Sequence, residues 1–188
     1  MRVNPKLLWL LVAVIAYAVA TRLANPHRKY STRQYWESAT VAQVADVPQK
    51  ALLPGNKNGS VLMWAAMGAR DPEILRALVR RGAAINEADV VFGGTPMSAA
   101  AGKSAHPEMI AVLKSLGADP NQRVNNGETP AMVAAQYNQT PGIIEALAAA
   151  GADLTARDHQ GRSALDLARA TGNSTAERAL MAAAPRER

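Results

Sequence analysis

An internal repeat of about 34 residues constrains the fold of this chain more than any other feature. Three segments align as Ser60-Val-Leu-Met-Trp-Ala-Ala66, Thr95-Pro-Met-Ser-Ala-Ala-Ala101 and Thr129-Pro-Ala-Met-Val-Ala-Ala135, and a weaker fourth reads Ser163-Ala-Leu-Asp-Leu-Ala168. Their first residues are 35, 34 and 34 positions apart. A second landmark, a Gly-Ala pair, begins 22 residues after each of the first three starts. This period predicts a stack of similar units, each burying its apolar face against its neighbours.

The residue types within each unit predict two short helices. Ser or Thr caps the first helix through its hydroxyl, Pro at the next position needs no N–H there, and the Ala pairs allow helices to approach closely. Aromatic residues make up only 4% of the chain, which favours packed helices over a sheet-rich core. The second helices are predicted to start at Pro72, Pro107 and Pro141. The residues in the capping position before these starts are Asp71, His106 and Thr140. A glycine in the left-handed conformation is predicted to end each second helix, at Gly82, Gly117 and Gly151.

At these residues the chain resembles the ankyrin repeat family, whose motif runs Thr-Pro-Leu-His-x-Ala-Ala and closes on Gly-Ala-Asp-x-Asn. The resemblance covers about residues 57–183. It implies an all-α ankyrin-repeat solenoid of helix-turn-helix units joined by turns or hairpins, with partners bound at the turn tips and on the concave face of the first helices. The chain departs from the motif at its His position, which here is Met63, Ser98, Met132 and Asp166.

The alignment sets the unit boundaries. Repeats one to three are predicted over 59–89, 90–124 and 125–158, followed by a C-terminal capping repeat over 159–184 and a tail over 185–188. Glu177 and Arg178 make the last helix polar, as the end of a solenoid requires. Residues 34–58 are interpreted as an N-terminal half-repeat cap. One helix over 34–44 is expected to pack four residues against repeat one, namely Tyr35, Trp36, Ala39 and Val44.

Residues 1–24 are interpreted as a signal peptide or a membrane anchor, and residues 25–33 as a basic linker. Arg2 and Lys6 precede an uncharged apolar run from Leu7 to Ala20, the usual pattern of an export signal. A helix of this length extends about 21 Å, less than the hydrocarbon layer of about 30 Å, and Ala18-Val-Ala20 fits a cleavage site. The bases from Arg22 onward favour a retained anchor instead, extended to residue 24. Both interpretations remain open.

Bases flank the apolar run on both sides, so the positive-inside rule does not decide its orientation. We favour an N-terminus-in arrangement with the repeats in a bacterial periplasm, because a basic start before a short apolar run is the common export pattern. The array would then be anchored to the inner membrane or released after cleavage near Ala20.

Charge and composition argue against nucleic-acid binding and against catalysis. The net charge is +6, but six of the 21 Lys and Arg lie in residues 1–34, which contain no acid, and the remaining 15 balance the 15 Asp and Glu. There is no Cys, the three His are far apart in sequence, and no hydrolase, nucleotide or zinc-protease motif occurs. The sequence therefore predicts no enzymatic activity, cofactor, metal site or small-molecule substrate.

Candidate partner-binding residues lie in the turn tips and on the concave face. The tip over 87–93 is one residue longer than the others and carries Val90, Val91 and Phe92, where Phe92 either anchors a partner or folds back over the neighbouring tip. On the concave face, Trp64 is interpreted as a core residue, while Tyr137 and Lys103 are expected to be exposed. The predicted partner-binding set is Val91, Phe92, Met67, Lys103, Gln136, Tyr137, Arg123 and Arg157.

The leading functional hypothesis is a non-catalytic protein–protein interaction module. It is a periplasmic, inner-membrane-tethered ankyrin adaptor that binds another protein of the envelope and stabilises or inhibits it, contacting the membrane through residues 7–24 if these are not cleaved. The alternatives are an immunity or antitoxin-like inhibitor of a toxin or enzyme, and a membrane scaffold that faces the cytoplasm.

Overall fold

The computed structural model describes residues 28–53, 59–90 and 93–183, and every regular element in them is a helix. The all-α prediction is confirmed for these residues. Residues 1–24, interpreted above as a signal or anchor, lie outside the described part, as do Val91 and Phe92. No helix of the described part is long and apolar enough to cross a bilayer.

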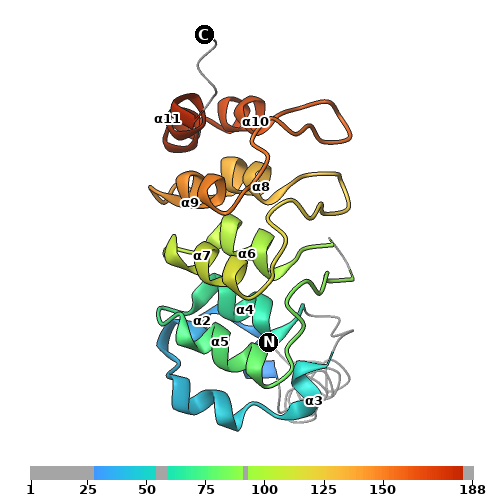
Figure 1. Ribbon diagram of the computed structural model, residues 1–188, viewed down its shortest axis with the longest axis vertical. Coiled ribbons are helices and arrows are strands. Elements are labelled where there is room, and N and C mark those ends of the chain that lie inside the picture. Colours follow the sequence, from blue (N-terminus) through green and yellow to red (C-terminus); the bar gives the residue numbers. More distant parts are fainter. Residues whose placement is uncertain (1–27, 54–58, 91–92, 184–188) are drawn as a thin grey trace, which may run out of the picture.

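Four helix pairs stack into an elongated array (Figure 1). The first helices of the pairs form an inner row beside the inter-repeat tips, and the second helices form an outer row. The pairs are α4 (Val61–Gly68) with α5 (Glu73–Arg80), α6 (Pro96–Lys103) with α7 (Glu108–Ser115), α8 (Pro130–Tyr137) with α9 (Ile143–Ala149), and α10 (Ala164–Thr171) with α11 (Ser174–Ala183).

The first helices begin as their capping residues predict. The Ser60 hydroxyl accepts a hydrogen bond from the Met63 N–H at 3.1 Å, and the Thr95 hydroxyl accepts one from the Ser98 N–H at 3.2 Å. The Ser98 hydroxyl in turn accepts from the Thr95 N–H at 2.8 Å. Ser98 occupies the position where the family motif has His, and its hydroxyl completes the capping box.

The second helices end as predicted and differ at their starts. Gly82, Gly117 and Gly151 have φ of 96°, 96° and 89°, the left-handed conformation that costs glycine little. In the third repeat the helix begins at Ile143 and not at Pro141, because Gly142 has φ of 86° and lies outside the helix.

The predicted capping residues of the second helices are correct only in the first repeat. The Asp71 carboxylate accepts the Glu73 N–H at 2.9 Å. His106 and Thr140 instead donate their own N–H groups, to Ser104 Oγ at 3.1 Å and Asn138 Oδ1 at 2.8 Å. The Ser104 and Asn138 side chains, each two residues earlier, therefore hold the backbone that leads into α7 and α9.

The N-terminal cap contains η1 (Arg28–Ser31), α2 (Arg33–Ser38), η2 (Val41–Asp46) and α3 (Gln49–Leu52). The prediction of a single helix over 34–44 is wrong: Ala39 is extended, and the Thr40 N–H donates to Gln43 Oε1 at 2.8 Å, which starts a new helix. Helix α2 packs on α4 of the inner row, while η2 packs on α5 of the outer row. The cap thus extends both rows of the array.

Aromatic side chains hold this cap together. Tyr30 donates its hydroxyl to the Asp46 carbonyl at 2.9 Å, and Trp36, with no exposed surface, donates Nε1–H to the Tyr30 carbonyl at 2.9 Å. Tyr35 packs edge-on against both rings. Residues 28–33, part of the expected basic linker, are therefore folded onto the cap.

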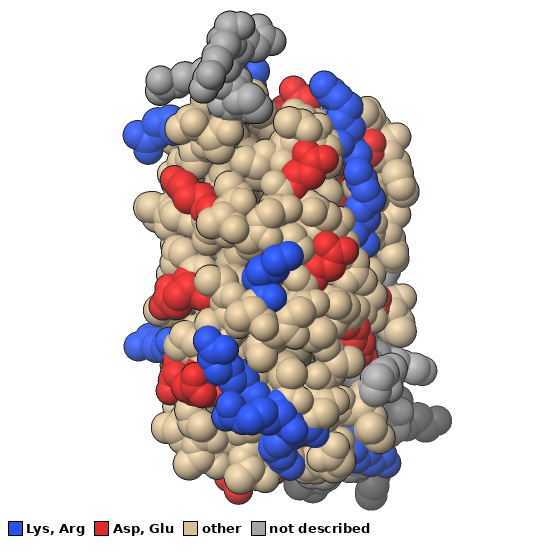
Figure 2. Space-filling view, in the orientation of Figure 1, with Lys and Arg blue, Asp and Glu red and all other residues tan. Residues whose placement is uncertain are grey.

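Charged side chains are unevenly spread over the surface. Figure 2 shows a band of Lys and Arg across the lower end of the molecule, over α5 and α3, and a second column along the tips in the upper half. At the last tip, Arg157 pairs with Asp166 at 3.6 Å and Arg162 with Asp158 at 2.7 Å.

Candidate binding groove

Each tip between repeats is closed by an equivalent backbone hydrogen bond. The N–H groups of Asp89, Val124 and Asp158 donate to the carbonyls of Gly94, Glu128 and Arg162 at 2.8, 3.0 and 3.0 Å. The first bond spans one residue more than the others, in agreement with the longer first tip in the sequence. The second and third tips are therefore hairpin-like turns beside the inner helices.

Two asparagines tie the repeats to one another below the tips. Asn86 donates Nδ2–H to the Gly117 carbonyl at 3.1 Å and accepts the Asp119 N–H at 3.0 Å. Asn121 repeats this pair of bonds with Gly151 and Asp153, at 3.0 and 2.7 Å. The equivalent Thr155 instead donates to the Asp153 carboxylate at 2.7 Å. The capping repeat that follows has no Gly-Ala-Asp segment, which accounts for the loss of Asn at this position.

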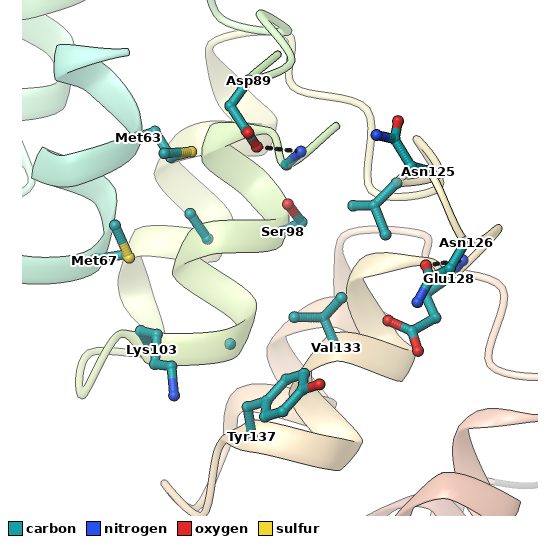
Figure 3. Close-up of a pocket in the computed structure, with 14 residues that line it drawn as sticks. Met63, Met67, Asp89, Ser98, Lys103, Asn125, Asn126, Glu128, Val133 and Tyr137 are labelled. Atoms are coloured by element: carbon teal, nitrogen blue, oxygen red, sulfur yellow. Dashed lines mark hydrogen bonds between the residues drawn. The ribbon is translucent and has the colours of Figure 1, made fainter. Parts of the chain in front are cut away.

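A groove of about 440 Å³ runs along the inner row between the tips and helices α4, α6 and α8 (Figure 3). Its floor is apolar, because Met63 and Met67 project from α4 and Val133 and Tyr137 from α8. Gly102 keeps α6 close to α8, since a Cβ there would lie 2.9 Å from Val133 Cγ1. The remaining lining residues are Asp89, Gly94, Ser98, Ala99, Lys103, Val124, Asn125, Asn126 and Glu128.

The two ends of the groove differ in charge. Lys103 lies at the end distant from the tips, with Nζ 5.4 Å from the centroid of the Tyr137 ring. At the tip end, the Asp89 carboxylate accepts the Gly94 N–H at 2.6 Å. The buried Glu128 carboxylate accepts from Gln136 Nε2 at 2.7 Å and lies 3.8 Å from Arg162. The groove therefore has a cation and an aromatic ring at one end, and at the other end carboxylates that already accept hydrogen bonds within the array.

Comparison with protein-family models identifies this architecture. A model of ankyrin repeats, three copies long, matches residues 62–158 and again 107–186. The chain belongs to the ankyrin repeat family. No curated protein matches the chain.

Ankyrin repeats indicate a protein–protein interaction module, and members of this family are typically non-catalytic. Within the described residues, no group of three His, Asp or Glu is placed to hold a metal ion.

The predicted partner-binding residues of the ankyrin array divide into three groups. Met67, Lys103 and Tyr137 line the groove, and the Tyr137 side chain is 57% exposed. Val91 and Phe92 lie outside the described residues. Gln136, Arg123 and Arg157 make hydrogen bonds within the array, and their contact with a partner stays a prediction.

Arg123 and Arg157 brace the tips. Arg123 donates from Nη1 to the Arg157 carbonyl at 2.7 Å, and Arg157 donates from Nη1 to the Gly161 carbonyl at 2.7 Å. Trp64, interpreted from sequence as a core residue, is partly buried and packs against the core.

Sequence reasoning left out most of the groove residues, among them Met63, Val133, Asp89 and Glu128. A usable signal was present, because Met63 with Met67 and Val133 with Tyr137 are spaced i, i+4 and share a helix face. Asp89 and Glu128 carried no such signal, since their positions depend on how the tips fold over the inner row.

Proposed function

We propose that the ankyrin array holds a segment of another protein in the concave groove. The observation that carries this proposal is the exposed apolar floor, formed by side chains from three successive repeats and closed at one end by Lys103 and Tyr137. Tyrosine is enriched among residues that dominate binding energy, and an apolar groove with a charged end orients a bound segment. The expected occupant carries an apolar side chain for the floor and a carboxylate for Lys103.

Crosslinking in cells tests this groove. A photo-reactive amino acid replaces Tyr137 in one strain, and Ala111, an exposed residue of α7 in the outer row, in a control strain. Crosslinked partners should form from position 137 and not from 111. With the captured partner purified, Tyr137→Ala should weaken its binding about thirtyfold, as for a hot-spot residue. Equal crosslinking from both positions would reject the groove as the binding face.

We further propose that the array works in the bacterial periplasm, tethered to the inner membrane, where it stabilises or inhibits one envelope protein. The support is the uncharged run from Leu7 to Ala20 with bases on both sides. A reporter that is active only in the cytoplasm, fused after Arg188, should stay inactive. Reporter activity would place the array on the other side of the membrane.

A further inference from the structure

The linear stacking of repeats turns a charge asymmetry of the sequence into a charge asymmetry in space. Residues 28–81 contain nine Lys and Arg and four Asp and Glu, whereas residues 82–183 contain seven and ten. In a compact globular fold these residues would mix. Here the described residues of the first group form the lower end of the array, and those of the second form its middle and upper end (Figures 1 and 2). The folded array therefore has an excess of bases at one end and an excess of acids at the other.

The positive end presents cations that the fold leaves available. We use the name basic end for six Lys and Arg of the cap and the first repeat: Arg28, Lys29, Lys50, Arg70, Arg76 and Arg80. Lys50 and Arg70 are exposed and form no ion pair with any described residue, whereas Arg76 pairs with Glu73 at 2.9 Å and Arg80 reaches Glu73 only at 3.8 Å. By contrast, Arg157, Arg162 and Arg169 in the upper half are paired with carboxylates. The excess of bases over acids is thus confined to the lower end of the array.

Chain length brings the basic end close to the apolar N-terminal run. Only residues 21–27 separate Ala20 from Arg28, and seven residues span at most about 25 Å when fully extended. If the run enters a bilayer, the basic end must remain near the headgroups. This connection favours a lipid surface over nucleic acid, as does the burial of Tyr30 and Trp36, which leaves these aromatic rings unavailable for base stacking.

We propose that the basic end docks on an anionic phospholipid surface, with the acidic end of the array pointing away from it. Each Lys or Arg held near such a surface contributes about fivefold to the affinity, and the contribution is lost when salt screens the charges. The acidic upper half is repelled by the same surface, so the array stands on its N-terminal end. In this orientation the groove stays open to a partner.

The test uses the full chain, whose lack of cysteine permits a single engineered label. A fluorophore is placed at Ala45→Cys beside the basic end or at Ala182→Cys at the far end, both exposed positions. Vesicles of phosphatidylcholine alone, or with phosphatidylglycerol added, carry a quencher on their headgroups. The apolar run has access to both vesicle types, so the neutral vesicles control for its insertion.

The proposal predicts stronger quenching at position 45 on the anionic vesicles than on the neutral ones, and no such difference at 182. The difference should vanish at about 1 M salt, where the Debye length is about 3 Å. In K50Q/R80Q the preference for anionic vesicles should fall about thirtyfold. The matched variant K114Q/R178Q loses two exposed bases outside the basic end and should keep the preference.

Three outcomes would overturn the proposal: equal quenching on both vesicle types, stronger quenching at 182, or an unchanged preference in K50Q/R80Q. A mixed-sequence RNA that displaces the protein from anionic vesicles, and whose binding is lost in K50Q/R80Q, would assign the basic end to nucleic acid instead. Crosslinking from position 137 should be unaffected by K50Q/R80Q, so failure of this proposal is distinguishable from failure of the groove.

Discussion

At the scale of single residues, the carboxylate of Asp158 stabilises the tip that contains it. Asp158 is buried and accepts the N–H groups of Gln160 and Arg162 at 2.8 and 2.9 Å, and the Arg162 guanidinium at 2.7 and 2.8 Å. Burial by itself would raise the pKa of Asp158, but these backbone and guanidinium hydrogen bonds outweigh it and hold the pKa below its ordinary value. The ionised form is therefore favoured by folding.

Asp158→Asn should destabilise the array at neutral pH and make its stability less dependent on pH in the acid range. A depressed folded-state pKa contributes stability above the unfolded value near pH 4, and this stability is lost as pH falls through the folded pKa. Urea midpoints of wild type and variant should therefore differ at pH 7 and converge below about pH 4. Glu145→Gln, an exposed change on α9, serves as the control. A difference independent of pH would contradict the role of the carboxylate charge.

At the scale of helices, buried asparagines join the ends of neighbouring inner helices. Asn138, only 7% exposed, follows α8 and donates Nδ2–H to the carbonyls of Ala101 and Ser104 near the end of α6, both at 2.9 Å. Asn173 does the same one repeat later, toward Ala135 and Asn138 at 3.0 and 2.8 Å. These side chains satisfy helix-end carbonyls that would otherwise lack partners.

Asn138→Ala should lower the free energy of unfolding by about 3 kcal/mol, because three hydrogen bonds of about 1 kcal/mol each are lost from a buried site. Chemical denaturation measures the change. The neighbouring Gln139→Ala removes an exposed side chain and should have little effect. Equal effects of the two substitutions would show that the bridge contributes nothing to stability.

At the scale of the whole molecule, stability depends on stacking, because each repeat contacts only its neighbours. The N-terminal cap covers both rows of repeat one, and Trp36 is its fully buried centre. Loss of the cap should therefore expose the first repeat before the last.

Trp36→Ala should cost about 3–5 kcal/mol, the usual effect of removing a buried Trp side chain. Hydrogen exchange should accelerate in α2, α4 and α5 and change little in α10 and α11. Tyr30→Phe, which removes the hydroxyl that donates to the Asp46 carbonyl, should show the same pattern at about 1 kcal/mol. Uniform acceleration along the array would mean that it unfolds as one cooperative unit.

The repeats, the capped starts of the first helices and the glycine ends of the second could be predicted from sequence, because these depend on local backbone chemistry. Thr40 and Gln43 were also a local signal, although the cap was predicted as a single helix. Tertiary structure decided the rest. Met67, Lys103 and Tyr137 converge on one groove, and Arg123 and Arg157 brace tips, because these contacts cross repeat boundaries. The charge asymmetry was present in the sequence, but only the linear stacking of repeats separates it into two ends, since each repeat keeps its place in the order of the chain.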